Sequence, residues 1–368
     1  MPEHSVRIDL AERSYEVRIG PGLLTRAGES MRVLTDAARA AIVTDTTVAP
    51  LCAPLVRTSL EGAGFFVSEV VVPAGEGSKS WRQAGDVLEA LASAGLDRDD
   101  VVVALGGGVV GDLAGFCAAS YLRGVDFVQL PTTLLAQVDS SVGGKTGLDL
   151  QAGKNLAGAF KQPLLVLADT EVLNTLSASE WASGLAEVAK VAILEGEERL
   201  AWTESNSREL CSRAASSVLE AVRASVAFKA RVVTADERES GLRECLNYGH
   251  TLGHAIEKIA GYGSVPHGVA VAEGIRFAAD LAVDAVAATP KFAARQKQLL
   301  DALSIPRARL EAGVAELRAA MASDKKARGG IPRFVLVSAP GDFTVRAVKE
   351  ELLDHHLQRY LADLEERG

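Results

Sequence analysis

The sequence has few cysteines and no long apolar run, and each scarcity excludes a class of protein. Its four cysteines are scattered through 368 residues with no CxxC pair. A chain of this length does not need disulfide staples, so we expect a reducing, cytoplasmic setting. No stretch approaches the roughly 20 apolar residues that span a bilayer. Residues 1–20 lack the apolar run of a signal peptide, so we expect no secretion signal.

Positive charge is also in deficit, with 39 Lys and Arg against 48 Asp and Glu and a net charge of -9. Nucleic acids and anionic membranes attract basic surfaces, so we expect neither as a partner. The chain is 48% hydrophobic and 24% charged, which is typical of a soluble globular protein and not of a disordered one. Its length predicts roughly two domains of about 150 residues each.

The first half of the chain alternates short apolar runs with helical patterns, such as the one at residues 80–94. Runs rich in Val, Leu and Ile predict strands at residues 5–10, 14–19, 41–44, 66–72, 101–105, 127–130 and 164–167. Alternation of strand and helix predicts an α/β domain with a mostly parallel sheet and helices on both faces.

The second half changes to long amphipathic helices. Helices are predicted at residues 179–194, 208–235, 267–286 and 290–303, followed by a short strand at 333–338 and a charged helix or tail at 348–368. We therefore predict an α/β domain over residues 1–176 and a helical domain over residues 177–368. Clefts between domains are favoured ligand sites, so we expect the ligand there.

A glycine loop follows the predicted strand at residues 101–105. Gly106, Gly108 and Gly111 form a GxGxxG pattern that leads into a helical pattern at residues 113–121. Such glycines let the backbone approach a pyrophosphate, and the helix N-terminus supplies free N–H groups and partial positive charge. A glycine-rich turn without a ligand is the alternative.

This glycine loop is not near the start of the chain, as it would be in a standard dinucleotide-binding domain. The residue that binds the ribose would therefore come from another strand. Asp45, at the end of the predicted strand 41–44, is the natural choice, and an ordinary helix cap is its alternative role. Glu76 and Lys79 lie in the segment GEGSK and could reach the adenosine end of a dinucleotide. A solvated turn is the simpler interpretation of that segment.

Arg243, Asn247, His250 and His254 are spaced by four, three and four residues, which predicts one face of a helix. Such a face would be costly to bury without a ligand or a metal. His250 and His254 alone could be two metal ligands at i and i+4. The Glu of the HExxH metalloprotease motif is absent, because Thr251 follows His250.

Two further residues extend this metal hypothesis. His267 opens the next predicted helix, and Glu187 lies in an apolar helix where a buried carboxylate needs a partner. Two His and one carboxylate suit zinc, cobalt or iron, with an open position for substrate. A salt bridge from Glu187 to Lys190, one turn further on, is the alternative.

Several basic residues stand out in this acidic chain: Arg123, Lys145, Lys154, Lys229, Lys325 and Lys326. Individually, each is most simply a solvated surface charge. Some lie beside glycines, where backbone or ligand approaches closely, and a small phosphorylated acid would need such a set. The segment GGKT at residues 143–146 is similar to the end of a phosphate loop. Asp139 stands where that loop requires Gly, so this is not a nucleotide triphosphatase signature.

Long motifs in a fixed order now resemble one family, 3-dehydroquinate synthase. They are GGGVVGDLAGF (106–116), PTTLLAQVDSSVGGKTG (131–147), GKNLAGAF (153–160), SGLAEVAK (183–190) and LNYGHTLGHAIE (246–257). The resemblance implies a Rossmann-like NAD-binding α/β domain, then a mostly α-helical metal- and substrate-binding domain, usually in a homodimer. It implies conversion of 3-deoxy-D-arabino-heptulosonate 7-phosphate to 3-dehydroquinate and phosphate in the shikimate pathway, with NAD regenerated each turnover.

The resemblance also implies roles for matching positions. The metal, zinc or cobalt, would be held by Glu187, His250 and His267. NAD would be held by Asp45, Gly75, Glu76, Lys79, Gly107, Gly108, Gly111, Asp112, Thr132, Thr133, Asp139, Lys145, Lys154 and Thr175. Substrate would meet Lys145, Asn155, Lys190, Lys229, Arg243, Asn247 and His254, with Arg123 lent across the dimer and Lys325 or Lys326 closing over the phosphate.

The sequence departs from the family pattern at two positions. Val269 stands where Glu is common, with Glu273 four residues later, and Asp149 stands where Asn is common. We expect the change at Val269 to alter the support of His267. Three alternatives stay open: a cyclase making a cyclitol such as a valiolone or deoxy-inosose, an iron-type polyol dehydrogenase, and a non-catalytic protein of this fold. The combination of Lys229, Arg243 and Asn247 favours an acidic substrate.

Overall fold

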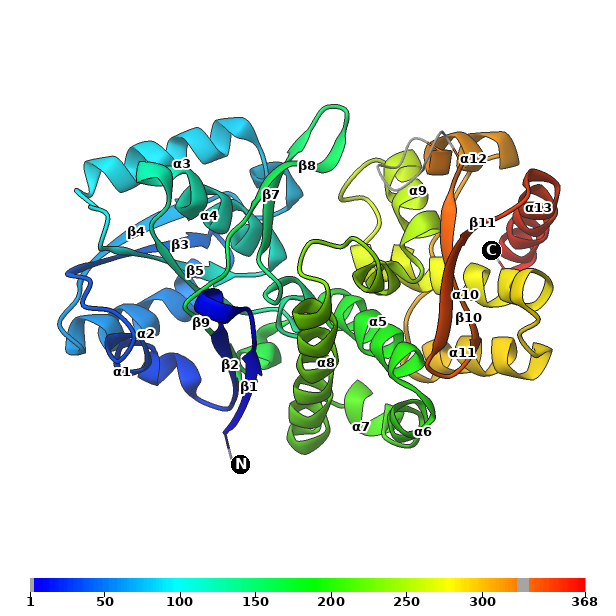
Figure 1. Cartoon of the computed structure of the whole chain (residues 1–368), viewed down its shortest axis with the longest axis horizontal. Coiled ribbons are helices and arrows are strands. Elements are labelled where there is room, and N and C mark those ends of the chain that lie inside the picture. The colour runs from blue at the N-terminus through cyan, green and yellow to red at the C-terminus, as the bar shows by residue number, and fades with distance from the viewer. Residues whose placement is uncertain (1–2, 323–330, 368) are drawn as a thin grey trace. The chain divides into compact units, whose positions relative to one another are not determined.

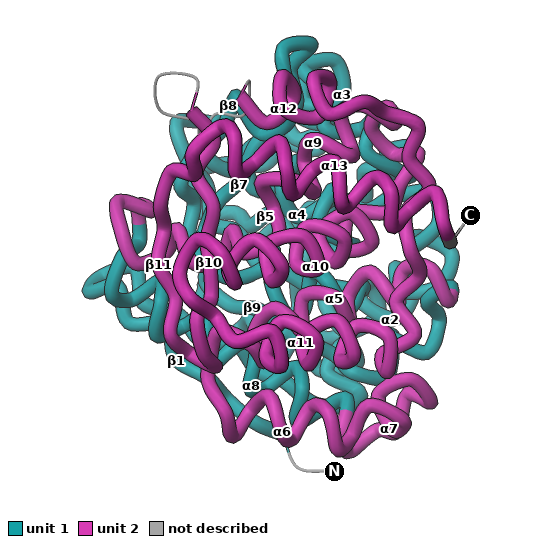
Figure 2. Tube along the Cα trace, turned by 90° about the vertical axis from the view of Figure 1, so that its right-hand side faces the viewer, with its two compact units in different colours: residues 1–177, 218–237 teal, residues 178–217, 238–368 magenta. Residues whose placement is uncertain are grey.

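The computed structural model describes residues 3–322 and 331–367, which form two compact units (Figure 2). Unit 1 comprises Met1–Ser177 and Val218–Glu237, and unit 2 comprises Ala178–Ser217 and Arg238–Gly368. The sequence assigned residues 218–237 to the second domain, whereas in the structure they cluster with unit 1. The reason is electrostatic in part, because Lys229 pairs with Asp139 and Glu237 pairs with Arg13.

Unit 1 is built on one seven-stranded sheet. In spatial order its strands are β1 (His4–Ile8), β2 (Tyr15–Gly20), β9 (Leu165–Asp169), β6 (Asp126–Pro131), β5 (Val101–Gly106), β3 (Arg39–Asp45) and β4 (Phe66–Val72). Every neighbouring pair is parallel except β1 and β2. The predicted strands are the strands of this sheet, and the prediction of a mostly parallel α/β fold is confirmed.

Helices cover both faces of the sheet (Figure 1). Helices α1 (Ala27–Arg32) and α2 (Ala49–Gly62) pack on the face to which Val101, Val103 and Leu105 point. Helices α3 (Trp81–Ser93) and α4 (Gly108–Ser120) pack on the opposite face, over Val102 and Ala104. Because both faces are covered, the strands read as continuous apolar runs, which is why the sequence revealed them.

The order in which successive strands are added to the sheet reverses between β3 and β5. It adds β4 beside β3, then returns to place β5 on the other side of β3. In open α/β sheets, ligands bind outside the carboxyl ends of the strands at such a switch point. Asp45 ends β3 and Gly107 follows β5, so both lie at this edge of the sheet.

A hairpin of β7 (Lys145–Leu150) and β8 (Gly153–Phe160) was not predicted from the sequence. Its strands carry glycines, which have low strand propensity, so the usual signal is missing. The glycines are needed for close packing. A Cβ on Gly158 would lie 2.3 Å from the Thr146 carbonyl oxygen, and one on Gly115 of α4 would lie 2.4 Å from the Thr146 methyl carbon.

Unit 2 is mostly helical, as predicted. Its helices are α5 (Ala178–Glu195), α6 (Glu197–Ser205), α7 (Ser207–Cys211), α9 (His250–Ala260), α10 (His267–Val286), α11 (Pro290–Ala302), α12 (Val314–Ala322) and α13 (Glu350–Arg367). The predicted late strand is β10 (Arg333–Ala339), which pairs with β11 (Asp342–Ala347). A single helix over 208–235 was wrong, because Arg213 adopts a left-handed φ of 60° between α7 and α8 (Ala215–Ala235).

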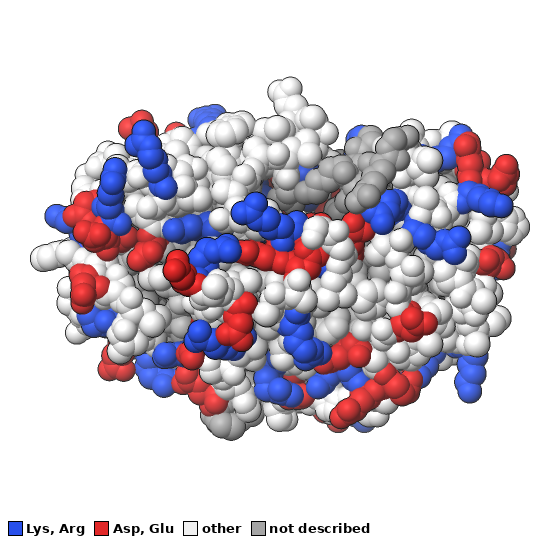
Figure 3. All heavy atoms as spheres, in the orientation of Figure 1, with Lys and Arg blue, Asp and Glu red and all other residues white. Residues whose placement is uncertain are grey.

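The surface shows no field of one sign on the face drawn in Figure 3, where basic and acidic side chains are interspersed. The net charge of -9 is therefore not gathered into one acidic patch on that face. In the described part of the chain, each helix is too short or too polar to cross a membrane.

Candidate active site

Helix α10 begins directly against α5, and a glycine makes this possible. A Cβ on Gly268 would lie 2.0 Å from the carbonyl oxygen of Ser183, so only glycine permits the contact. The N–H of Gly268 donates to the hydroxyl of Ser183 at 2.8 Å, which fixes the two helices together. His267 precedes Gly268, and Glu187 lies one turn after Ser183 on α5. The contact therefore brings His267 and Glu187 together.

A second glycine contact brings the start of α9 against α10. Gly249 has a left-handed φ of 81°, and a Cβ there would lie 2.6 Å from the carbonyl oxygen of Val271. A Cβ on Gly274 would lie 1.7 Å from the carbonyl oxygen of Gly249. Glycine at both positions lets the two backbones touch. His250, the first residue of α9, is placed beside α5 and α10 in this way.

Glu187, His250 and His267 form the one compact group of metal-ligating atoms found among the described residues, all within 4.8 Å of one another. Oε1 of Glu187 lies 3.8 Å from Nε2 of His250 and 4.0 Å from Nε2 of His267. These distances are too long for hydrogen bonds. Three ligand atoms that each bind the same ion at about 2.0–2.2 Å would lie slightly closer to one another than these three atoms do. A small movement of the side chains would therefore bring them to ligand distances.

The hydrogen bonds around these residues fit a metal. Nδ1 of His250 lies 3.1 Å from the Tyr248 carbonyl oxygen, and Nδ1 of His267 lies 3.2 Å from Oε2 of Glu257. Each Nδ1–H therefore donates outward, which leaves the Nε2 lone pair facing Glu187. Oε1 of Glu187 is buried and has no hydrogen-bond partner among the described residues. A divalent cation would satisfy that oxygen and both lone pairs at once.

Lys190 is buried one turn after Glu187 and pairs with its Oε2. The salt bridge that the sequence offered as the alternative role of Glu187 is thus present. It uses only one carboxylate oxygen, and Oε1 still faces the two imidazoles. The salt bridge is therefore compatible with a metal role for Glu187, and the ammonium of Lys190 lies at the edge of the candidate metal site.

The prediction that Arg243, Asn247, His250 and His254 share one helix was wrong. Arg243 and Asn247 lie on a 3₁₀ segment, η7 (Leu242–Asn247), and α9 starts only at His250. The close crossing at Gly249 forces the break, which no spacing rule reveals. Arg243 is buried, and the amide of Asn247 donates to Oε1 of Glu239 at 2.7 Å. The imidazole centres of His254 and His267 lie 6.2 Å apart, so His254 borders the metal group.

Support for His267 comes from a residue to which the sequence had assigned no role. Glu257 lies on α9 at seven residues from His250 and three from His254, so it shares their helix face. That spacing was the signal available in the sequence. Val269 is buried in α10. The buried carboxylate of Glu273 contacts Arg276, Arg307 and Tyr360 instead.

In unit 1 the glycine loop lies at the switch point, and α4 starts from it with no side chain capping its N-terminus. Its glycines serve close packing within the protein. A Cβ on Gly107 would lie 3.0 Å from the Thr133 methyl carbon. A Cβ on Gly108 would lie 2.9 Å from Ser140 Oγ, and one on Gly111 would lie 2.8 Å from Gln129 Oε1. The uncapped N–H groups of α4 fit a pyrophosphate.

Lys79 lies at the centre of an ionic cluster. Its ammonium lies 2.8 Å from Asp112, 3.7 Å from Glu76 and 3.9 Å from Asp149, and Lys154 lies 3.4 Å from Glu76. Only 5% of Lys79 is exposed, so the solvated-turn interpretation was wrong for Lys79, whereas Gly75 and Gly77 of the same segment are exposed. Burial lowers the pKa of Lys79, but the three carboxylates outweigh it and hold the pKa above its ordinary value. Burial raises the pKa of Asp112 against the opposing effect of Lys79.

Other predicted nucleotide residues lie at the ends of the strands. Oδ1 of Asp45 accepts from the N–H groups of Thr47 and Val48, so its side chain holds the turn before α2, whose own N-cap residue is Val48. The N–H of Thr132 donates to the Gly106 carbonyl oxygen at 3.0 Å, which joins β6 to the glycine loop. The buried hydroxyl of Thr132 has no partner among the described residues. It is available to a ligand at this edge of the sheet.

Two pairs link residues that the family pattern assigns to different ligands. Lys229 donates to the carbonyl oxygen of Asp139 at 2.7 Å and also pairs with its carboxylate. Oδ1 of Asn155 accepts a hydrogen bond from Lys79. The first pair joins an expected substrate residue to an expected NAD residue on unit 1, and the second does the same through the β7–β8 hairpin.

The remaining predicted residues are placed as follows. Lys145 opens β7 with its side chain exposed, and Gly75 precedes Glu76 with a left-handed φ of 99°. Thr175 is exposed on η6 (Val172–Thr175), and its hydroxyl donates to the Val172 carbonyl oxygen. Arg123 is exposed at the end of η4 (Tyr121–Arg123), with a left-handed φ of 71°. Lys325 and Lys326 lie outside the described residues.

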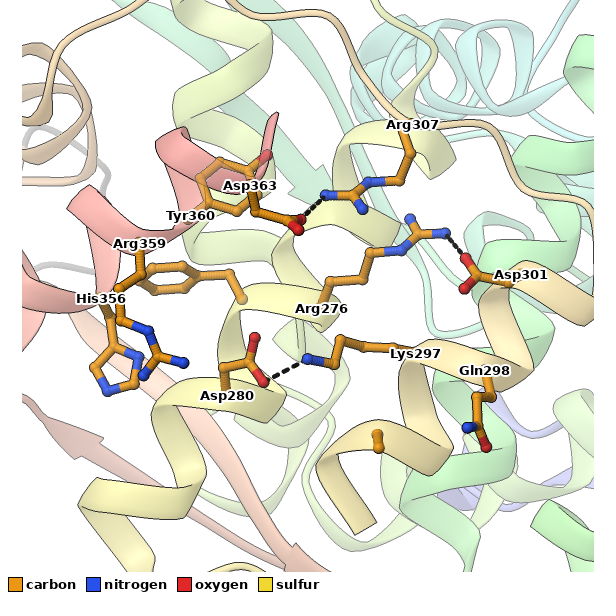
Figure 4. Close-up of a pocket in the computed structure, with 12 residues that line it drawn as sticks. Arg276, Asp280, Lys297, Gln298, Asp301, Arg307, His356, Arg359, Tyr360 and Asp363 are labelled. Carbon is orange, nitrogen blue, oxygen red and sulfur yellow. Dashed lines mark hydrogen bonds and ion pairs between the residues drawn. The ribbon is translucent and has the colours of Figure 1, made fainter. Parts of the chain in front are cut away.

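Unit 2 has a hollow of about 360 Å³ between α10, α11 and α13 (Figure 4). Its charged walls are largely paired with each other: Arg276 with Asp301, Lys297 with Asp280, and Arg307 with Asp363. The first residues of α9 and α10, which carry the metal group, do not line it. This hollow is therefore separate from the candidate active site.

Comparison with known proteins agrees with this geometry. Residues 69–183 match the family model described as 3-dehydroquinate synthase N-terminal, and residues 184–327 match 3-dehydroquinate synthase C-terminal. The 3-dehydroquinate synthase of Paracoccus denitrificans (strain Pd 1222) is 47% identical over 357 residues, covering 95% of this chain and 97% of the relative. That of Geobacter metallireducens (strain ATCC 53774 / DSM 7210 / GS-15) is 46% identical over 353 residues, covering 95% and 98%.

A solved structure is also similar over the whole chain. The 2-epi-5-epi-valiolone synthase from Streptomyces hygroscopicus subsp. jinggangensis 5008, with NAD⁺ and Zn²⁺ bound, aligns with a TM-score of 0.87 at 28% sequence identity. The alignment covers 98% of this chain and 99% of that chain.

Proposed function

The chain belongs to the 3-dehydroquinate synthase family, and from this premise we propose that it converts 3-deoxy-D-arabino-heptulosonate 7-phosphate to 3-dehydroquinate and phosphate. Within this chain, the proposal rests on the group of Glu187, His250 and His267. Their candidate ligand atoms face one another, and Nδ1 of each histidine already has a hydrogen-bond partner on the far side of the ring. Two His and one Glu leave a coordination position open, as catalytic zinc sites do.

The proposed cofactors are NAD and a divalent metal, zinc or cobalt. When bound, NAD would take up and return a hydride, and the metal would polarise a substrate oxygen that gains charge. NAD would lie at the switch point, with its pyrophosphate at the uncapped N-terminus of α4 and its ribose near Asp45. The ionic cluster around Lys79 would fix the β7–β8 hairpin beside it through Asn155.

The chain's own residues would hold the two anionic ends of the substrate. Lysine and arginine side chains bind carboxylate and phosphate, and we assign this task to Lys145, Lys190, Lys229, Arg243 and Arg123 together with Asn155, Asn247 and His254. Holding both ends restricts the substrate to one orientation, which favours phosphate elimination and ring closure over side reactions. The pairing of Lys229 with Asp139 supports neighbouring positions for substrate and NAD.

We also propose a homodimer working in the cytoplasm. Arg123 supports the dimer, because it is an exposed arginine on a left-handed turn that presents its side chain away from its own unit's core. Four cysteines without a disulfide support a reducing compartment.

A phosphate-release assay tests the activity. The purified chain, supplied with NAD⁺ and Zn²⁺ or Co²⁺, is given the heptulosonate phosphate, and inorganic phosphate and absorbance of NADH are followed together. We expect phosphate release at many turnovers per enzyme with no net NADH, because each hydride taken up is returned.

A matched sugar phosphate without the carboxylate is the control substrate. It should turn over much more slowly, because Arg243, Asn247 and Lys229 would lose their partner. Equal turnover of that control would favour a cyclitol-forming cyclase. Net NADH accumulation would favour a polyol dehydrogenase, and no phosphate release from the heptulosonate phosphate would refute the proposal.

A further inference from the structure

In unit 2, the buried carboxylate of Glu257 contacts His267 on the side of the imidazole that faces away from Glu187. Oε2 of Glu257 lies 3.2 Å from Nδ1 of His267, and only 2% of Glu257 is exposed. The other ring nitrogen of His267 lies 4.0 Å from Oε1 of Glu187. The imidazole therefore lies between two carboxylates, one on each ring nitrogen.

We propose that Glu257 is a positioning residue for the metal, acting through His267; this inference rests on the proposed function. By accepting the Nδ1–H, Glu257 selects the tautomer whose Nε2 lone pair can bind the ion, and it orients the ring. Its negative charge also makes the imidazole a stronger donor to a cation. Glu257 is not itself a ligand, because the atom it contacts faces away from Glu187.

The position of His267 explains why it needs this support more than His250 does. His250 follows a glycine turn packed against α10, and its Nδ1 is held by the backbone carbonyl of Tyr248. His267 is the first residue of α10, and its side chain is 32% exposed. A side chain with that exposure at the start of a helix can adopt several rotamers. The hydrogen bond to Glu257 on the neighbouring helix α9 restricts the His267 side chain to one of them.

No other acid in the described part of unit 2 is placed to do this. The family's common Glu is Val269 here, which is buried and offers no acceptor. Glu273, the next acid along α10, already binds Arg307 at 2.6 Å and Tyr360 at 3.1 Å. Glu187 faces Nε2, the opposite ring nitrogen.

The experiment measures metal binding directly, apart from activity. The chain is stripped of metal, and Co²⁺ is titrated in competition with a chelator while the visible absorption of bound cobalt is recorded. We expect Glu257→Ala to weaken Co²⁺ binding by about 10- to 100-fold and to shift the cobalt spectrum. Glu257→Gln keeps an acceptor for Nδ1–H but loses the charge, so it should lose less than about 10-fold.

Glu273→Gln is the matched control, because Glu273 is an equally buried carboxylate of the same unit with no contact to His267. It should lower thermal stability yet leave the Co²⁺ affinity and spectrum unchanged. Unchanged Co²⁺ affinity and spectrum in folded Glu257→Ala and Glu257→Gln would overturn the role of Glu257. Failure of the unaltered chain to bind Co²⁺ would instead overturn the metal site of the proposed function, and this inference with it.

Discussion

The ammonium of Lys79 lies 2.8 Å from Oδ2 of Asp112; the lysine side chain is buried and that of Asp112 is mostly buried. Asp112 sits in the first turns of α4, and Lys79 precedes α3, so this pair joins the two helices on one face of the sheet. The N–H of Asp149 also donates to the Lys79 carbonyl oxygen at 2.8 Å. Lys79 thus connects α4 and the β7–β8 hairpin at the proposed nucleotide site.

Replacing Lys79 by Met should unfold the chain more easily. The change leaves Asp112, Glu76 and Asp149 without their common cation, and because these carboxylates are only partly buried the loss should be about 1–3 kcal/mol. Lys154→Met removes a cation that lies 3.4 Å from the partly exposed Glu76, and it should cost less than about 1 kcal/mol. Urea unfolding of both variants measures the difference. Equal losses would contradict the central role of Lys79.

Replacing Gly268 by Ala should damage the metal site through packing alone. The new Cβ would lie 2.0 Å from the Ser183 carbonyl oxygen, so α10 must move away from α5 and carry His267 with it. We expect a loss of about 1–3 kcal/mol in unfolding free energy and weaker Co²⁺ binding. Gly313→Ala is the control, because nothing lies within 4 Å of its Cβ, and it should change neither quantity. Wild-type Co²⁺ affinity in Gly268→Ala would show that this contact does not set the site.

Replacing His250 by Ala should remove both metal and activity, whereas His254→Ala should keep the metal. His250 belongs to the group whose donor atoms lie within 4.8 Å of one another, and His254 does not. Loss of a ligand should exceed the roughly 100-fold effect of losing a supporting residue. Metal content after gel filtration, read beside phosphate release, checks both variants. Full activity of His250→Ala, or loss of metal from His254→Ala, would refute the assignment.

Cys117 should make the protein sensitive to alkali. Burial raises the pKa of its thiol from an ordinary 9.0 to about 12, so the folded chain keeps a proton that the unfolded chain releases. This stabilisation is complete below pH 9.0 and is lost as pH rises toward 12, at about 1.4 kcal/mol per pH unit. Cys117→Ala should therefore show a shallower fall in unfolding free energy between pH 9 and 10.5. Parallel curves would contradict a buried, protonated thiol.

Much of unit 1 was predictable because its strands are buried on both faces. Residues 101–105 and 127–130 read as apolar runs, and burial beneath helices is the reason for those runs. The β7–β8 hairpin was not predictable, because its glycines Gly147 and Gly158 are required by the close contact between its own two strands. The break before His250 was missed for the same reason, since Gly249 is required by α10 and not by its own neighbours.

The sequence alone determined the alternating α/β unit, the helical second half and the family, and it supplied the candidate metal ligands, because apolar periodicity and long motifs are local properties of the chain. It could not determine which donors would face one another. That was decided by tertiary packing at Gly268, Gly249 and Gly274, where absent side chains let three helices touch. Packing likewise decided that Glu257 supports His267 and that Lys79 is buried among carboxylates, because each contact joins residues on different elements.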